Sequence, residues 1–219
     1  LIDGPGNPYA RLKMAGLDPN ALTDIVLTHF HPDHVSGIPL LLMALGLSGR
    51  KEPLNIYANS HCLIYSQQVL EFYNWDKWHD FPVNFYILEE TELFQLIDDE
   101  EFRIFSSPVV HYVPAIGLRI EFKQTGKVFA YSGDTAPVAS LIPLAQDADV
   151  LVHEAAGEQA QGHSSARQAA EIALEAGVKA LYLIHYPVGG FSYETLVDEA
   201  QQVFKGPVTM AEDFMEIEF

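Results

Sequence analysis

The stretch Thr28-His29-Phe30-His31-Pro32-Asp33-His34 directly follows a short apolar run, residues 25–27, that is typical of a buried β-strand. Three histidines and one carboxylate therefore fall within six residues, a donor set that divalent metal ions use. At the end of a strand, alternation places the first two histidines on one side, and the turn at Pro32 directs the following Asp and His toward the same pocket. The stretch predicts two adjacent metal ions, one bound by the histidine pair and the other by the Asp-His pair.

Two metal ions need more ligands than this stretch supplies, so a lone His or Asp at another strand end is a candidate. Three residues meet this description, each directly after an apolar run: His111, Asp134 and His185. In layered α/β folds, the loops that follow strands build the functional site. Together with the first stretch, these three residues indicate one metal centre with two ions.

The pattern of apolar runs predicts an α/β fold with layered sheets covered by helices, because strands and amphipathic helices alternate over the last third of the chain. Strands are expected at residues 25–28, 54–58, 83–88, 102–106, 116–122, 128–132, 150–153 and 180–184. Helices are expected at residues 8–16, 35–45, 60–73, 137–145, 164–176 and 193–204. Ser164 or Ser165 can cap the fifth helix, and Gly177 ends it. No repeat or low-complexity linker divides the sequence, which predicts a single domain over residues 1–219.

The charge of the chain restricts its partners. Twelve basic residues against 30 acidic ones give a formal net charge of -18, which disfavours binding of extended nucleic acid and favours a small substrate. The single cysteine, Cys62, excludes an internal disulfide framework and a thiolate metal cluster. The longest apolar run, residues 38–47, is about half of a membrane span, so we expect a soluble, cytoplasmic protein without a membrane partner. The first residue is not Met, and we expect the natural beginning of the chain to be missing.

The order and spacing of these residues resemble the metallo-β-lactamase superfamily, in which a His-x-His-x-Asp-His segment precedes a lone His, a bridging Asp and a last His. The resemblance implies an αββα four-layer sandwich whose opening strands would precede Leu1, and it implies a homodimer. It also implies two divalent metal ions, for which we expect zinc, although manganese or iron fits the same donors. The implied ligands are His29, His31 and His111 for one ion, Asp33, His34 and His185 for the other, and Asp134 as the bridge.

Four further segments indicate the branch of the superfamily. They are His111-Tyr112-Val113-Pro114, Ser132-Gly133-Asp134-Thr135, His153-Glu154-Ala155 and Gly162-His163-Ser164-Ser165. This series resembles ribonuclease Z and its phosphodiesterase and arylsulfatase-like relatives. The resemblance implies that His163 protonates the leaving group and that Glu154 orients His163. An imidazole is suited to donating a proton near neutral pH. The expected catalytic residues are Asp33, His163 and Glu154.

The sequence also departs from ribonuclease Z. That enzyme carries a long basic, Gly- and Pro-rich arm, and no such insertion is present; Arg50-Lys51 is the sole basic pair. We therefore expect a phosphodiesterase that acts on small or single-stranded phosphodiesters through a hydroxide bridging the two metals. The alternatives are a ribonuclease Z-type tRNA 3′ processing endonuclease, or an acyl or sulfate-ester hydrolase, lactonase or arylsulfatase-like, on the same metal pair. A non-catalytic binding subunit is a further alternative.

Three other histidines are not assigned to the metals. His61 begins a predicted helix beside Ser60, where helix capping explains it. His79 lies in a loop of mixed aromatic residues that we expect either to pack or to form the rim of the substrate site. His153 ends a strand, and the resemblance implies a position behind the site.

Overall fold

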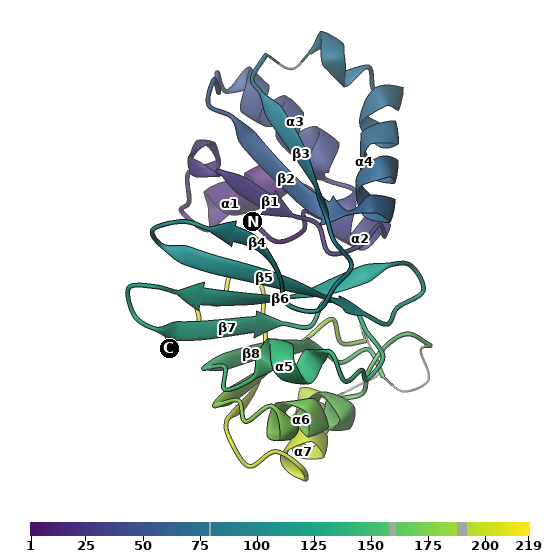
Figure 1. The fold of residues 1–219 in the computed structure, drawn as a ribbon, viewed down its shortest axis with the longest axis vertical. Coiled ribbons are helices and arrows are strands. Elements are labelled where there is room, and N and C mark those ends of the chain that lie inside the picture. The colour runs from purple at the N-terminus through teal and green to yellow at the C-terminus, as the bar shows by residue number, and fades with distance from the viewer. Residues whose placement is uncertain (79, 158–160, 188–191) are drawn as a thin grey trace. The chain divides into compact units, whose positions relative to one another are not determined.

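The computed structural model describes residues 1–78, 80–157, 161–187 and 192–219 (Figure 1). His79, expected to pack or to form a substrate rim, lies outside these residues. The chain divides into two compact units, Leu1–Glu89 and Glu90–Phe219, and each contains one β-sheet with helices packed against it. The predicted α/β class with two helix-covered sheets is therefore confirmed. No helix among the described residues is long and apolar enough to cross a lipid bilayer.

The first unit is a three-stranded parallel sheet in the order β1-β2-β3, drawn in purple to blue in Figure 1. Its strands are β1 (Asp24–Val26), β2 (Leu54–Asn59) and β3 (Val83–Leu88). Its α-helices are α1 (Pro8–Met14), α2 (Pro32–Val35), α3 (Ile38–Leu47) and α4 (Ser60–Phe72), and single 3₁₀ turns lie at Pro19–Ala21 and Trp75–Lys77. Alternate strand residues such as Ile25 and Ile56 form one core with the leucines of α3 and α4, so the helices cover one face of the sheet.

Two local expectations in this unit are wrong. The helix predicted at residues 35–45 is two helices, α2 and α3, which separate at Gly37. A Cβ atom at Gly37 would lie 2.6 Å from the carbonyl oxygens of Gly4 and Gly6, so the N-terminal segment passes directly over this glycine. Helix α4 is capped by Asn59, whose side chain accepts a 2.8 Å hydrogen bond from the backbone N–H of Cys62. Capping therefore belongs to Asn59 rather than to Ser60 and His61.

The second unit is a seven-stranded mixed sheet in the order β10-β9-β8-β7-β6-β5-β4. The strands are β4 (Phe94–Asp98), β5 (Phe102–Val109), β6 (Ala115–Phe122), β7 (Lys127–Tyr131), β8 (Val150–Glu154), β9 (Ala180–Ile184) and β10 (Val208–Met210). The helices are α5 (Leu141–Ala145), α6 (Ala166–Glu175) and α7 (Tyr193–Gln201). Strands β4 to β7 pair antiparallel, and β7 to β10 pair parallel, so the C-terminal half is built from strand-helix-strand units.

The sequence pattern predicts five of the seven strands of this sheet, and the two edge strands, β4 and β10, were not expected. Edge strand β4 lies among acidic residues and has no continuous apolar run, and edge strand β10 contains three residues. The start of α6 agrees with expectation, because Ser165 and Gln168 form a reciprocal capping box. Gly177, with φ of +69°, follows the helix as predicted.

Candidate metal centre

In the first unit, the histidine segment begins where strand β1 ends. The backbone N–H of Leu27 still donates to the carbonyl of Tyr57, and the chain then leaves the sheet. His31 occupies the N-cap of α2, and Pro32 stands at the first helical position, where its missing N–H costs nothing. The turn predicted at Pro32 is therefore a single turn of helix, which carries His34.

The three histidine rings of this segment converge. The Nε2 atom of His29 lies 3.1 Å from Nδ1 of His31, and the ring centroids of His29 and His34 are 4.0 Å apart. His29 is fully buried and His34 nearly so. The side chain of Asp33 is 63% exposed, and its Oδ2 atom lies 3.9 Å from Nε2 of His34. The segment thus brings all four of its predicted ligands to one place.

Asp3 contacts the histidine segment, and sequence reasoning missed it. Its Oδ2 atom lies 2.8 Å from Nδ1 of His34 and accepts a 2.8 Å hydrogen bond from the hydroxyl of Thr28. Its Oδ1 atom accepts a 2.7 Å bond from the backbone N–H of Thr28. A carboxylate on the distal nitrogen of a ligand histidine fixes its tautomer and leaves Nε2 for the metal. The available signal was an acidic residue directly after the apolar pair Leu1-Ile2.

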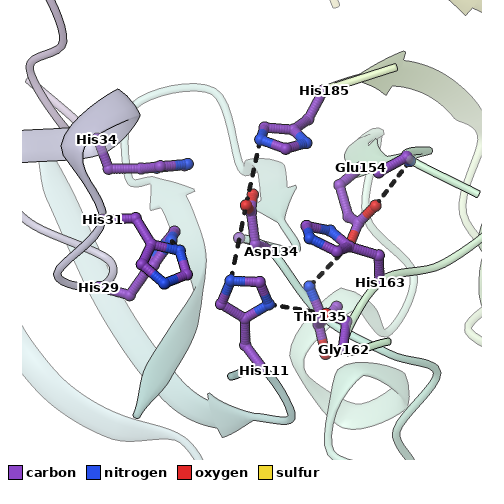
Figure 2. Close-up of polar contacts among 12 residues, drawn as sticks. His29, His31, His34, His111, Asp134, Thr135, Glu154, Gly162, His163 and His185 are labelled. Atoms are coloured by element: carbon purple, nitrogen blue, oxygen red, sulfur yellow. Dashed lines mark hydrogen bonds and ion pairs between the residues drawn. The ribbon is translucent and has the colours of Figure 1, made fainter. Parts of the chain in front are cut away.

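In the second unit, Asp134 lies between two histidines. Its Oδ2 atom is 3.2 Å from Nε2 of His185 and 4.0 Å from Nε2 of His111, and Figure 2 draws both contacts as dashed lines. Asp134 is 2% exposed. The tight turn before it needs Gly133, whose φ is +61° and whose added Cβ would lie 2.5 Å from the carbonyl oxygen of Ile116. One carboxylate oxygen thus faces two imidazole nitrogens.

Backbone contacts fix the orientation of His111. Its Nδ1 atom lies 2.8 Å from the carbonyl oxygen of Gly162, so Nδ1 carries the proton and Nε2 has none (Figure 2). Strand β5 is held next to the Asp134 turn, because the N–H of Val110 donates to the hydroxyl of Thr135 at 3.1 Å. The segment that contains His163 therefore also positions a predicted metal ligand.

His163 is paired with a buried carboxyl group. Its Nδ1 atom lies 2.8 Å from Oε1 of Glu154, which is fully buried. Burial raises the pKa of Glu154, while the N–H groups of Ala156 and Thr135, each 2.9 Å from a carboxylate oxygen, act against that shift. The His163 ring lies nearly parallel to that of His185, with centroids 5.4 Å apart.

The two remaining histidines in the described residues have other surroundings. His153 is completely buried, and burial lowers its pKa to about 4, so its ring is neutral at physiological pH. Its Nδ1 atom lies 2.8 Å from the carbonyl oxygen of Glu154, which places it beside the backbone of the Glu154 strand. His61 packs edge-on against Tyr65, with ring centroids 4.8 Å apart.

The donor chemistry of both groups fits divalent metal ions. Two ligands on a tetrahedral ion with bonds of about 2.0–2.1 Å are roughly 3.3 Å apart, and the nitrogens of His29 and His31 are separated by 3.1 Å. In the second unit, the donor atoms of His111, Asp134 and His163 lie within 4.8 Å of one another, as do those of Glu154, His163 and His185. The structure therefore assembles the predicted residues into one group per unit.

Comparison with known proteins identifies the family. The model of the family described as the beta-lactamase superfamily domain matches residues 4–186. The chain is 31% identical to ribonuclease Z of Methanothermobacter thermautotrophicus, and the alignment covers 100% of this chain and 86% of that protein. It is 29% identical to ribonuclease BN of Cronobacter sakazakii, and that alignment covers 98% of this chain and 87% of the ribonuclease.

Solved structures give the same result. The metallo-beta-lactamase fold protein YhfI from Bacillus subtilis superposes with a TM-score of 0.79 and 25% identity, over 97% of this chain and 84% of that one. The short form of human tRNase Z superposes with a TM-score of 0.78 and 26% identity, and the match covers 99% of this chain and 86% of the human protein. The resemblance inferred from the sequence is confirmed.

Proposed function

This chain belongs to the beta-lactamase superfamily and is a metal-dependent hydrolase, and from this premise we propose that it cleaves phosphodiester bonds in small or single-stranded substrates. The observation that carries the proposal is the pairing of His163 with Glu154 beside Asp134 and His185. An alkoxide leaving from phosphorus is a strong base and needs a proton as the bond breaks. A positioned imidazole next to metal ligands can supply that proton.

The proposed ligands are His29, His31 and His111 for one ion, Asp33, His34 and His185 for the second, and Asp134 as the bridge. The convergence of the donor atoms inside each unit supports this assignment. Divalent ions held there, for which zinc is expected, would supply an activated water nucleophile and would neutralise the charge that develops on phosphorus. The imidazole nitrogens and carboxylate oxygens of the site also fit manganese or iron.

The protein's own residues hold and move the protons. Asp3 accepts from Nδ1 of His34 and keeps the other nitrogen of that ring free of its proton. Glu154 holds Nδ1 of His163, so that Nε2 of His163 is the atom that gives its proton to the departing oxygen. The two N–H bonds on the Glu154 carboxylate keep it in the orientation that His163 requires.

Charge and alignment length support a small substrate. The net charge of -18 opposes long polyanions. The alignment to the Methanothermobacter ribonuclease Z has 274 positions against the 219 residues of this chain, so at least 55 of its positions fall opposite gaps in this chain. The missing positions agree with the absence of a basic arm in the sequence.

The same relatives favour a second candidate, a tRNA 3′ processing endonuclease of the ribonuclease Z type. Two curated relatives at 31% and 29% identity carry ribonuclease names. Because the chemistry at phosphorus is the same for both candidates, the size of the substrate distinguishes them. A precursor tRNA transcript and a small phosphodiester are therefore tested on the same preparation.

The test is a substrate panel on protein whose metal content has been measured. The panel contains bis(p-nitrophenyl) phosphate, a precursor tRNA, a lactone, a β-lactam and an aryl sulfate. We expect turnover of the phosphodiester and little or no cleavage of the tRNA. Turnover of an acyl or sulfate ester, with no phosphodiester cleavage by the fully metallated protein, would overturn the proposal. Less than one metal ion per chain, with no turnover, would support a binding subunit instead.

A homodimer and a cytoplasmic location are part of the same proposal, and family resemblance supports both. Light scattering on the purified protein measures its molecular mass in solution and so tests the homodimer. We expect a mass of two chains, and a mass of one chain would refute the dimer.

A further inference from the structure

The backbone of His185 has the left-handed conformation, with φ of +51°. His185 is the first residue after strand β9, and its Nε2 atom points toward Asp134, 3.2 Å from Oδ2 of that carboxylate (Figure 2). A residue with a Cβ atom adopts a positive φ infrequently, and the conformation persists where the surrounding structure holds it. The contacts that hold the backbone at His185 therefore also decide where its ring lies.

Strand β9 is held on both sides immediately before His185. On one side, the N–H of Ala155 donates to the carbonyl oxygen of Ile184 at 2.8 Å and extends the pairing with β8. On the other side, the N–H of Ala211 donates to the carbonyl oxygen of Leu183 at 2.8 Å, directly after the end of β10. The chain that enters His185 is thus fixed by both neighbouring strands.

Tyr186 fixes the chain that leaves His185. Its hydroxyl group donates to the carbonyl oxygen of Ala211 at 3.0 Å, and its ring packs against the hydrophobic core of the second unit. Ala211 therefore binds this part of the chain at two points, Leu183 before the histidine and Tyr186 after it. These two bonds close the short segment 183–186 around the residue with the positive φ.

The two parts of the Tyr186 side chain contribute in different ways. The ring contributes apolar burial, which a phenylalanine would keep, and the hydroxyl contributes the bond to Ala211, which a phenylalanine would lose. Replacement of Tyr186 by Phe therefore removes the bond and leaves the packing of the ring in place.

We infer that Tyr186 is a positioning residue for His185 and, through it, for the metal ion that His185 is proposed to bind. This inference rests on the proposed function and names a residue that sets the affinity of one of its ions. The bond to Ala211 keeps His185 in the left-handed conformation and so directs Nε2 toward Asp134. Without that bond, the backbone relaxes toward negative φ, and metal binding has to restore the strained conformation.

The expected effect is that of one neutral hydrogen bond. Such a bond contributes a net free energy that corresponds to a factor of about two to twelve in an equilibrium constant. We therefore expect Tyr186→Phe to weaken binding of the ion at His185 by about two- to twelvefold.

The test is a titration of metal-free protein with cobalt(II), followed by its absorption spectrum. His185→Ala removes the ligand and so identifies the ion that depends on His185. Tyr186→Phe should weaken that same ion and leave the dissociation constant of the other ion unchanged, whereas a merely structural role would weaken both ions alike. The matched control is Tyr182→Phe, which removes a hydroxyl from a half-buried position within β9 and should leave both constants unchanged. Equal constants in Tyr186→Phe and Tyr182→Phe would overturn the inference.

Amide hydrogen exchange separates this inference from the proposed function. If the wild-type protein binds no cobalt ion that His185→Ala loses, the proposed ligand set fails, and exchange in the metal-free protein decides the role of Tyr186. The probe is the N–H of Ala211, and the internal reference is the N–H of Ala155 on the other side of β9. Faster exchange of Ala211 relative to Ala155 in Tyr186→Phe than in Tyr182→Phe supports the positioning role. The same exchange ratio in both variants refutes it.

Discussion

The Nδ1 atom of His163 lies 2.8 Å from Oε1 of Glu154, and the same oxygen accepts the backbone N–H of Thr135 at 2.9 Å. Thr135 directly follows Asp134, so the proposed proton donor and the carboxylate between His111 and His185 are tied to each other through one buried carboxyl group. The hydroxyl of Ser164 adds a second tie, because it donates to the carbonyl of Thr135 at 2.7 Å. The site of the second unit is therefore one hydrogen-bonded network.

The role of His163 predicts a dependence on the leaving group. In His163→Ala, cleavage of an alkyl phosphodiester should fall by about 10²–10⁴, because the departing alkoxide receives no proton. Cleavage of a p-nitrophenyl ester should fall by less than about tenfold, because that leaving group is stable as an anion. Rates for a series of esters, on protein with unchanged metal content, measure the difference. An equal loss for all leaving groups would contradict the assignment of His163 as the acid.

The contact between Asp3 and His34 predicts an effect on metal affinity. Asp3→Asn removes the negative charge that holds Nδ1 of His34, and the affinity for the metal should fall by about 10- to 100-fold. Chelator competition measures the dissociation constant. Asp80→Asn is the matched control, because Asp80 pairs with Lys51 at the surface and should leave the affinity unchanged. The same affinity in Asp3→Asn and wild type would show that Asp3 has no role at the metal.

The hydrogen bonds that Asp149 accepts predict a contribution to the stability of the fold that depends on pH. Burial favours the neutral acid, but hydrogen bonds from Lys179, the N–H of Val128 and Lys127 outweigh it and lower the pKa of Asp149 to about 2. The unfolded value is about 3.9, so the carboxylate stabilises the fold above about pH 4, and this contribution is lost as the pH falls toward 2.

Asp149→Asn should therefore lower the free energy of unfolding by about 1–2 kcal/mol at neutral pH, a value reduced because both lysines are partly exposed. The difference should shrink as the pH falls below 4. Urea unfolding of both proteins at several pH values measures it. The control variant is Asp198→Asn, at an exposed position of α7, and its free energy of unfolding should differ little from that of the wild type at any pH. A difference that stays constant with pH would refute the ionic origin of the effect.

The proposed ligand residues could be located in the sequence because each follows a strand that is visible as an apolar run. The His29 to His34 segment, His111, Asp134 and His185 all follow such runs, so local pattern and strand geometry are sufficient to propose them. Resemblance to a family was needed to connect His163 with Glu154, because they are nine positions apart, Glu154 ends strand β8, and His163 lies in the segment before α6.

The features that were missed depend on contacts between distant residues. Asp3 meets Thr28 and His34, which are 25 and 31 positions away in the chain. The break between α2 and α3 at Gly37 follows from the close passage of Gly4 and Gly6, which no periodicity in residues 35–45 records. Strands β4 and β10 form by pairing with the edges of β5 and β9, respectively. Their own sequences contain little alternation of apolar and polar residues, so they are hard to predict from the sequence.

The central claim is that bound divalent metal ions enable phosphodiester hydrolysis at these residues. The most direct measurement is the rate of bis(p-nitrophenyl) phosphate hydrolysis as a function of metal ions per chain, starting from chelator-treated protein. The account predicts no rate without metal, a rate that rises on addition of zinc or manganese and saturates at two ions per chain, and fewer ions with little rate in Asp134→Ala. A metal-free protein that hydrolyses the ester at the full rate, or an Asp134→Ala variant with two ions and full activity, would contradict the account.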